Sequence, residues 1–410
     1  MLRVPLVQAR PGMRLAISVL HPERPDTMLL RAGFTLDERS IERLRSMFLP
    51  EIWVEYPDLR FIEKFISPKI VQQRGATQKL LNEIFERLSS NSNAKLDYAV
   101  YRNTIRDFVQ SLIDEPDAAL YIQAMSDGNR PLMRHSADVT FLCLLMGLKL
   151  DAYLISQRKR LAAHRAKEVV ALGVGGLLHD IGLLEIEEEA LQRFYQTQDE
   201  TDPEFRRHVE VAYEHINGEL DAPAAAAILH HHQHFDGSGF PARDTGDGQM
   251  RGFAGEEIHI FARILTAADL FDRVRYPTPS GHPRPTVAAL NALRQKPYVD
   301  WIDPVVFKAL LAVVPAYAPG TIVKLSNGEC GAVIDWDPAD PCRPIVQQIV
   351  EMEELTLAQP SPRPGTRYVL AERRDLCIVE ADGVDVSKAN FYPRHDAEFT
   401  LLGTETQAAA

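Results

Sequence analysis

The stretch EVVALGVGGLLHDIG at residues 168–182 predicts an apolar helix that ends in a histidine and an aspartate. On such a helix, His179 shares a face with Glu168 and Leu172, so an imidazole and a carboxylate stand together on an element that is otherwise core. Burying the charge of Asp180 is costly unless a cation or hydrogen-bond donors compensate it. A single His-Asp pair is more often structural than functional, so its meaning depends on similar residues elsewhere.

Histidines are concentrated in the middle of the chain, where eleven of the thirteen lie between His135 and His282. Such clustering suggests a metal site, because neutral imidazole is a common metal ligand. Further inward-pointing candidates are His135, His208, His231, His232 and Asp269. Together with His179 and Asp180 they offer seven nitrogen and oxygen donors without a thiolate. This number makes a site for two metal ions plausible.

The pattern along the chain predicts a multidomain α+β protein with an all-α core. Helical periodicity runs through residues 131–317, and Asp202-Pro203-Glu204 and Asn217-Gly218 mark the start and end of one predicted helix with His208 in its middle. After Pro319 the period becomes two, with a turn signal at Asn327-Gly328. The predicted units are a small N-terminal α+β regulatory module (1–66), a helical connector (67–130) that either dimerises or packs as a bundle, the helical domain (131–317), a small β domain (318–392) and a tail (393–410).

Composition narrows the class of protein. The chain has 410 residues, of which 45% are hydrophobic, and its formal charge is −12 from 45 basic and 57 acidic side chains, so direct nucleic-acid binding and attraction to anionic membranes are not expected. The four cysteines form no CxxC pair, which argues against a disulfide scaffold and fits a reducing compartment. No apolar run reaches the roughly 20 residues of a spanning helix. We therefore expect a soluble protein of the cytoplasm.

The ordered motifs of the helical region resemble those of the HD-GYP family, the HD phosphohydrolases that hydrolyse the bacterial second messenger cyclic di-GMP. The resemblance covers about residues 136–314, and the segments PGMRLA and PGTIVKLSNGECGAVI also look like extensions common in the family. It implies an HD-type helical core. The matching motifs are HDIG (179–182), RRHVEVAYEHI (206–216), ILHHHQHFDGSGFP (228–241), ARILTAADLFD (262–272) and IDPVVFKALL (302–311).

The resemblance also implies the roles of single residues. Asp180 would bridge two divalent transition metal ions, with iron or manganese favoured and zinc or nickel as alternatives, and His179 and Asp180 would be catalytic. Pro131 stands where members with a third metal carry a glutamate, which is why two ions are expected. Arg243 and Arg284 are candidate substrate-binding residues. The metal ligands carried over from the family are His135, His179, Asp180, His208, His231, His232 and Asp269.

Three departures from the family pattern bear on activity. Leu183 replaces the lysine that usually follows HDIG, Gln233 replaces the glutamate of HHE, and Phe240 replaces the tyrosine of GYP. Loss of the lysine removes a cation from a site that must hold phosphodiester charge. His230 and His234 are expected beside the ligands or on the surface.

The implied function is a phosphodiesterase in which a hydroxide held between the two metals converts cyclic di-GMP to pGpG, or onward to GMP. The alternatives are a weakly active or inactive cyclic-nucleotide sensor or interaction protein, and an HD phosphohydrolase that acts on another nucleotide. The expected partners are cyclic di-GMP, diguanylate-cyclase (GGDEF) domains contacted through the loop around Phe240, and a second copy of the chain in a homodimer.

Overall fold

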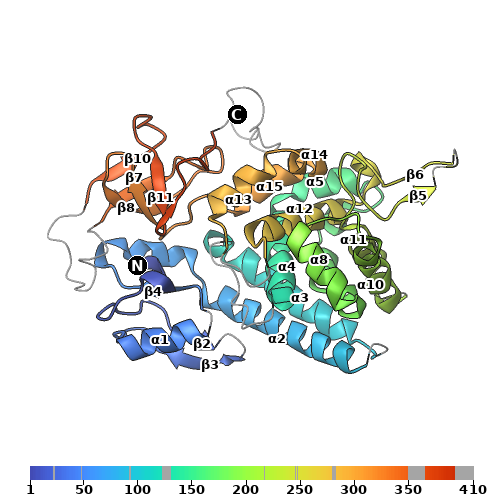
Figure 1. Cartoon of the computed structure of the whole chain (residues 1–410), viewed down its shortest axis with the longest axis horizontal. Coiled ribbons are helices and arrows are strands. Elements are labelled where there is room, and N and C mark those ends of the chain that lie inside the picture. The colour runs from blue at the N-terminus through green and yellow to red at the C-terminus, as the bar shows by residue number, and fades with distance from the viewer. Residues whose placement is uncertain are drawn as a thin grey trace.

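The predicted fold class is confirmed by the computed structural model, in which a helical core is flanked by an N-terminal α+β module and a C-terminal sheet (Figure 1). The helices fill the right of Figure 1, and the strands of both chain ends gather on the left. The structure describes residues 1–21, 24–47, 49–91, 94–121, 131–216, 218–244, 246, 248–278, 283–349 and 365–392. The predicted tail (393–410) lies outside the described residues.

The N-terminal module contains two small antiparallel sheets and one helix. β1 (Leu2–Pro5) pairs with β4 (Glu51–Val54), and β2 (Val19–His21) pairs with β3 (Arg24–Leu30). The helix is α1 (Glu38–Ser46), which begins at a capping box. Short 3-10 helices span Leu6–Gln8 and Pro57–Phe65.

The helical core is arranged around α4, which packs against helices from three later parts of the chain. Every residue of α4 from Met133 to Gly147 is buried, including Arg134, His135 and Asp138, so these polar side chains depend on partners inside the core. The helices of the predicted connector (67–130), α2 and α3, also pack into this core. The helices are α2 (Pro68–Ser90), α3 (Tyr98–Asp114), α4 (Pro131–Lys149), α5 (Asp151–Gln157), α6 (Ala163–Ala166), α7 (Val170–Leu178), α8 (Glu188–Thr197), α9 (Pro203–Arg206), α10 (His208–Ile216), α11 (Ala222–His230), α12 (Ile260–Arg275), α13 (Thr286–Leu293), α14 (Tyr298–Trp301) and α15 (Pro304–Val313).

Short elements connect these helices. The 3-10 helix η4 (Ile181–Glu185) follows the His-Asp pair, and two further 3-10 helices span Pro116–Ala118 and Gly255–Glu257. A small hairpin of β5 (Arg243–Asp244) and β6 (Met250–Arg251) lies between α11 and α12. Within the described residues no single helix has both the length and the apolar composition to cross a membrane; α4 and α5 together do, but they meet at a bend of 85°.

Two predictions about helices are wrong. The single helix expected between residues 203 and 217 is broken at Arg207 into α9 and α10, so His208 begins a helix instead of lying in its middle. The imidazole Nδ1 of His208 donates to the carbonyl oxygen of Phe205 at 2.5 Å. In an unbroken helix that oxygen would accept from the backbone N–H four residues later. In addition, α7 begins only at Val170, so Glu168 lies before the helix and not on its face.

The C-terminal domain is one six-stranded antiparallel sheet in the order β10-β9-β8-β7-β11-β12. The predicted hairpin is confirmed, because β7 and β8 pair across a turn in which Gly328 has a φ of +88°. The strands are β7 (Ile322–Leu325), β8 (Cys330–Asp335), β9 (Ile345–Gln348), β10 (Arg367–Val369), β11 (Ile378–Ala381) and β12 (Val384–Asp385).

The two ends of the chain form one composite body with a shared core. Leu2 and Trp53 from the N-terminal module are buried in the same apolar cluster as Ile334 of the sheet. Arg3 crosses the boundary, since its guanidinium donates to Thr321 at 2.7 Å and pairs with Asp382 at 2.6 Å. Neither small module has enough chain to bury a large apolar area alone, and their association supplies it.

Candidate metal centre

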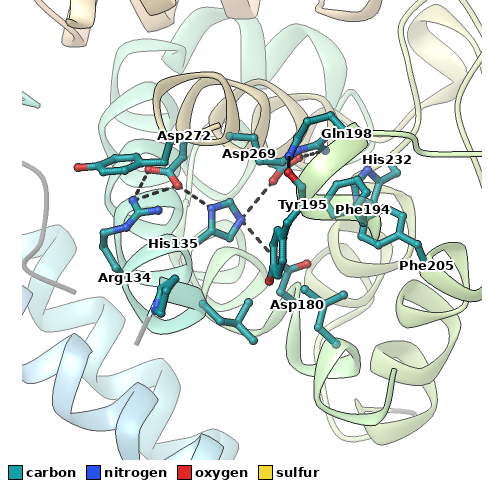
Figure 2. Close-up of a pocket in the computed structure, with 15 residues that line it drawn as sticks. Arg134, His135, Asp180, Phe194, Tyr195, Gln198, Phe205, His232, Asp269 and Asp272 are labelled. Carbon is teal, nitrogen blue, oxygen red and sulfur yellow. Dashed lines mark hydrogen bonds and ion pairs between the residues drawn. The ribbon is translucent and has the colours of Figure 1, made fainter. Parts of the chain in front are cut away.

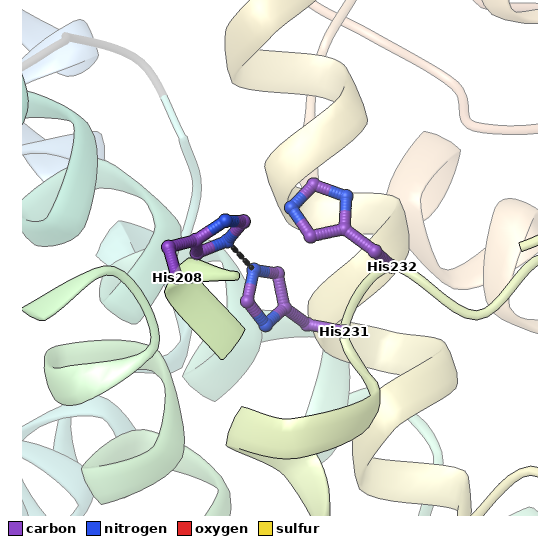
Figure 3. Close-up of side chains that lie close together, drawn as sticks. All are labelled: His208, His231 and His232. Carbon is purple, nitrogen blue, oxygen red and sulfur yellow. Dashed lines mark hydrogen bonds between the residues drawn. The ribbon is translucent and has the colours of Figure 1, made fainter. Parts of the chain in front are cut away.

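The structure brings six of the predicted ligands into two buried groups of three. His135 from α4 lies with His179 and Asp180 at the end of α7, and the ligand atoms of this group are all within 4.8 Å of one another. The second group meets the same limit and combines His208, at the start of α10, with His231 and His232, which follow α11 (Figure 3). Each ligand therefore stands at or near a helix end, where the backbone directs it inward.

Asp180 lies between the two groups, with one carboxylate oxygen toward each. Its Oδ2 is 3.4 Å from Nε2 of His135 and 3.3 Å from Nε2 of His179. Its Oδ1 is 3.6 Å from Nε2 of both His208 and His231. Burial alone would raise the pKa of Asp180, but the neighbouring imidazoles, first of all His179, hold it well below its usual value. An ionised carboxylate with this geometry suits a ligand shared by two cations.

The Nδ1 atoms of the imidazoles are already engaged, so that Nε2 is left for a metal. Nδ1 lies 2.9 Å from the carbonyl oxygen of Gly176 in His179 and 2.7 Å from that of Ile228 in His231. The same kind of bond holds His208, as described above. Because a carbonyl oxygen only accepts, each Nδ1 carries the proton and each Nε2 keeps its lone pair. This is the tautomer that binds a metal through Nε2.

Pairs of these Nε2 atoms approach one another closely. Nε2 of His179 is 3.2 Å from Nε2 of His135, and Nε2 of His208 is 3.4 Å from Nε2 of His231. Burial lowers the pKa of His208 well below its usual value, and burial next to His231 lowers that of His232 to about 4. A neutral Nε2, such as that of the buried His208, presents a lone pair that a metal cation can accept. The donor set therefore fits divalent metal ions, and each group could hold one.

His135 differs from the other imidazoles because carboxylates surround it. Burial lowers its pKa, but hydrogen bonds to Asp180, Asp269 and Asp272 outweigh burial and hold the pKa well above its usual value. Its Nδ1 is 2.7 Å from Asp272, and its Nε2 is 3.2 Å from Asp269, the seventh predicted ligand. Figure 2 shows His135 between Asp272 on one side and Asp269 and Asp180 on the other. A cation at this point would take the place of the proton.

Several residues at the site were missed by the sequence reasoning. Asp272 orients His135 and also accepts from Arg134, at 2.9 and 3.1 Å from its two oxygens. Glu200 is buried and lies 3.5 Å from Nδ1 of His232. Asp272 follows Asp269 by three residues on an apolar helix, which is a signal that could have found it. Glu200 lies in a loop without periodicity, and nothing in the pattern indicates it.

A pocket opens beside His135 and Asp180 of the first group and His232 of the second. Figure 2 shows Tyr195 and Phe194 of α8 beside Asp180 and His232 in its wall. Its described lining residues are Pro131, Leu132, Arg134, His135, Asp180, Leu183, Phe194, Tyr195, Gln198, Phe205, His232, Asp269, Asp272, Arg273 and Tyr276. The pocket thus combines carboxylates and imidazoles on one side with aromatic and aliphatic side chains on the other.

The two arginines nominated as substrate contacts are not among these lining residues. Arg243 in β5 pairs with Glu257 at 2.8 Å and lies over the ring of Phe253, 4.0 Å from its centroid. Arg284 is exposed just before α13. The structure does not bring either arginine to the pocket, and their substrate-binding role stays a prediction.

The histidines that flank the HH pair lie near it. His234 is 3.2 Å from Glu200 through its Nε2 and stacks on Trp301, and His230 packs near Phe253.

The three departures from the family motifs leave the ligand atoms in place. Leu183 is buried in an apolar cluster with Phe205 and Phe240. The ring of Phe240 stacks on His232 with centroids 4.6 Å apart, and because it is only 2% exposed, it is not itself available to dock a partner. Gln233 fixes the loop by donating to the carbonyl oxygen of Pro241 at 2.7 Å. These side chains shape the site without supplying ligands.

Known proteins match most of this chain. Residues 149–306 match the family model described as HD domain. Cyclic di-GMP phosphodiesterase PA4108 of Pseudomonas aeruginosa is 25% identical over 366 residues, 81% of each protein, and cyclic di-GMP phosphodiesterase response regulator RpfG of Xanthomonas campestris pv. campestris is 30% identical over 109 residues, 26% of each. The solved structure of Bd1817, a HDG"Y"P protein from Bdellovibrio bacteriovorus, has a TM-score of 0.42 and 15% identity, with 75% of this chain and 97% of that one covered. The chain therefore contains an HD domain, and its similarity to the long relative agrees with the ordered motifs that resemble the HD-GYP family.

Proposed function

We propose that this protein is a metal-dependent phosphodiesterase that hydrolyses cyclic di-GMP to pGpG, and onward to GMP. The observation that carries the proposal is the position of Asp180, whose two oxygens face two groups of imidazoles at 3.3 to 3.6 Å. The relatives named as cyclic di-GMP phosphodiesterases support the choice of substrate. In the reaction, water adds to phosphorus, the bond to the 3′ oxygen breaks, and that oxygen takes up a proton.

We further propose that two divalent ions, iron or manganese before zinc or nickel, are held by the seven predicted ligands, with Asp180 shared between them. Mixed imidazole and carboxylate donors without thiolate suit these metals. Such a pair of ions supplies Lewis acidity to the phosphate and activates the attacking water. Four imidazoles lie 3.3 to 3.6 Å from the Asp180 carboxylate, and the other two predicted ligands, His232 and Asp269, are buried beside them.

The protein's own residues prepare the pocket for this reaction. The bonds from Nδ1 to carbonyl oxygens and to Asp272 fix the orientation of each imidazole before substrate arrives. The apolar wall of Leu183, Phe194 and Phe205 keeps bulk water from one side of the phosphate. Burial raises the pKa of Tyr195 above its usual value, so its hydroxyl stays a hydrogen-bond donor in the pocket.

The test is an assay on protein purified with Mn²⁺ or reduced iron, with cyclic di-GMP and its products separated by chromatography. Wild type should linearise the nucleotide, and His179→Ala and Asp180→Ala should abolish this activity. His164→Ala is the matched control because His164 is exposed in α6, away from both groups. Nucleotide binding without turnover in metal-loaded wild type would contradict the enzyme and favour a sensor.

The remaining proposals concern partners and place. We propose that the loop between α11 and α12 docks a GGDEF domain, through its exposed hairpin residue Met250 instead of the buried Phe240. We also propose a homodimer and a cytoplasmic location, the latter because all four cysteines are free thiols. Size-exclusion chromatography with light scattering tests the dimer, and pull-down with Met250→Asp tests the hairpin.

A further inference from the structure

We propose that Arg273 is the residue that binds a phosphate group of the substrate in the pocket. The inference rests on the proposed function, since it assigns a phosphate contact to the same site. Arg273 lies on α12, one turn after Asp269, and lines the pocket. It was not among the arginines that the sequence nominated. The supporting geometry is the position of Arg273 between the carboxylates of Glu200 and Asp269, each of which also contacts a histidine.

The pocket needs a cation that the HDIG motif does not provide. Leu183 stands directly after HDIG and is packed with Phe194, Phe205 and Phe240, so this wall offers no positive charge. Among the described residues that line the pocket, the permanent cations are Arg134 and Arg273. Each phosphodiester group of cyclic di-GMP carries one negative charge, which one of these two guanidinium groups could contact.

Arg134 is bound to two carboxylates through Nη1, and its Nε is buried without a hydrogen-bond partner among the described residues. Its Nη1 donates to both oxygens of Asp272 and lies 3.3 Å from Asp138, while its guanidinium lies 3.5 Å from the centroid of the Tyr276 ring. Its side chain is only 5% exposed. Moving it toward a ligand would leave Asp272 with His135 as its remaining partner among the described residues and would break the contact with the Tyr276 ring.

Arg273 is bound in a similar way but is more exposed, with 13% of its side chain accessible against 5% for Arg134. Its Nη1 contacts Glu200 at 2.7 Å and Asp269 at 3.0 Å, whereas its Nε is buried without a hydrogen-bond partner among the described residues. Each of the two carboxylates has other positive or proton-donating neighbours: His135 for Asp269, and His232 and His234 for Glu200. Its guanidinium, 5.1 Å from the centroid of the Phe194 ring, therefore has donors to offer at the pocket wall.

The two carboxylates also explain why an arginine suits this point. They fix the guanidinium in place before substrate binds. Because this planar group has five N–H donors, it can stay bonded to one carboxylate while it donates to a second anion. A phosphate that displaces Glu200 from Arg273 would accept charge-assisted hydrogen bonds from the guanidinium. This guanidinium lies beside Asp269, one of the predicted metal ligands.

The test compares Arg273→Met and Arg273→Lys with wild type in the full-length, metal-loaded protein. Metal per chain is measured by elemental analysis, and affinity by calorimetry with cyclic di-GMP and, separately, with inorganic phosphate. Arg193→Met is the matched control, because Arg193 is on the neighbouring α8 in an exposed ion pair with Asp202. Since a charged hydrogen bond contributes about 1.5 to 3 kcal/mol, affinity for both probes should fall about 10- to 100-fold in Arg273→Met. Arg273→Lys should keep part of it, and metal content should not change.

Two results would overturn the inference. The first is wild-type affinity for both probes in Arg273→Met with its metal in place. The second is loss of metal in parallel with loss of affinity, which would make Arg273 a holder of Asp269 and not a phosphate ligand. Failure of the proposed function is distinguishable, because it would appear as absence of cyclic di-GMP hydrolysis in wild type, while the inorganic phosphate titration would still report on Arg273.

Discussion

Replacement of Asp272 by asparagine should switch the tautomer of His135 and so weaken metal binding. Asp272 has one oxygen 2.7 Å from Nδ1 of His135, and Nη1 of Arg134 lies within 3.1 Å of both oxygens. An asparagine has one acceptor where the aspartate has two. Since Arg134 can only donate, it will take the amide oxygen, and the amide NH₂ will then face the Nδ1–H of His135.

Two donors cannot share that contact, so the imidazole moves its proton to Nε2 or turns away. Either response removes the lone pair that points at Asp180 and Asp269. Loss of a hydrogen-bonding partner behind a ligating histidine typically costs about 10- to 100-fold in metal affinity. Because the tautomer changes here as well, we expect the upper end, about 100-fold or about 2.7 kcal/mol.

The assay is a calorimetric titration of metal-depleted protein with Mn²⁺. Asp138→Asn is the matched control, since it removes a carboxylate charge from the same Arg134 and leaves the bond between Asp272 and His135 in place. Both variants should lose stability, but only Asp272→Asn should lose metal affinity. A dissociation constant within about threefold of wild type for Asp272→Asn, or an equal loss in Asp138→Asn, would refute the reasoning.

Three further outcomes are expected. In metal-free protein the pKa of His232 is about 4, against 6.5 in the unfolded chain, so the unfolded state binds more protons between these pH values. The free energy of unfolding should therefore fall by up to about 3 kcal/mol as the pH drops from about 6.5 to 4. Chemical denaturation across this pH range measures the change. Gly182→Ala would place a methyl group 2.0 Å from the carbonyl oxygen of His208, so metal content and melting temperature should both drop, and retention of both would contradict the packing. Arg3→Met should cost about 1 to 3 kcal/mol in urea denaturation, because it leaves the half-buried Asp382 without the Arg3 guanidinium.

The sequence was sufficient for the elements whose signals are local. His179 and Asp180 end an apolar helix, His231 and His232 follow an alanine-rich one, and Asp269 lies on an apolar stripe. In each case the periodicity predicts the buried face of the helix, and burial of several histidines and aspartates indicates a common metal site. The hairpin at Asn327-Gly328 was predictable for the same reason, because the turn residues and the flanking strands agree.

Features that depend on distant contacts could not be predicted in this way. The break before His208 arises because its side chain takes a backbone acceptor, an outcome that helical propensity does not report. Glu200 reaches His232 from a loop, and Arg273 reads in sequence as an ordinary solvated charge on the last turns of a helix. Their roles come from what lies opposite them in the folded chain.

The shared core of the two chain ends has a consequence for biosynthesis. Arg3 is separated in sequence from Thr321 by 318 residues and from Asp382 by 379, so these pairings can form only after nearly the whole polypeptide has left the ribosome. Until then the apolar cluster that holds Leu2 and Trp53 lacks its part from the sheet, such as Ile334, and a chain cut short before β7 would never acquire it. Premature termination should therefore yield a product that aggregates, because the C-terminal strands complete the shared apolar core.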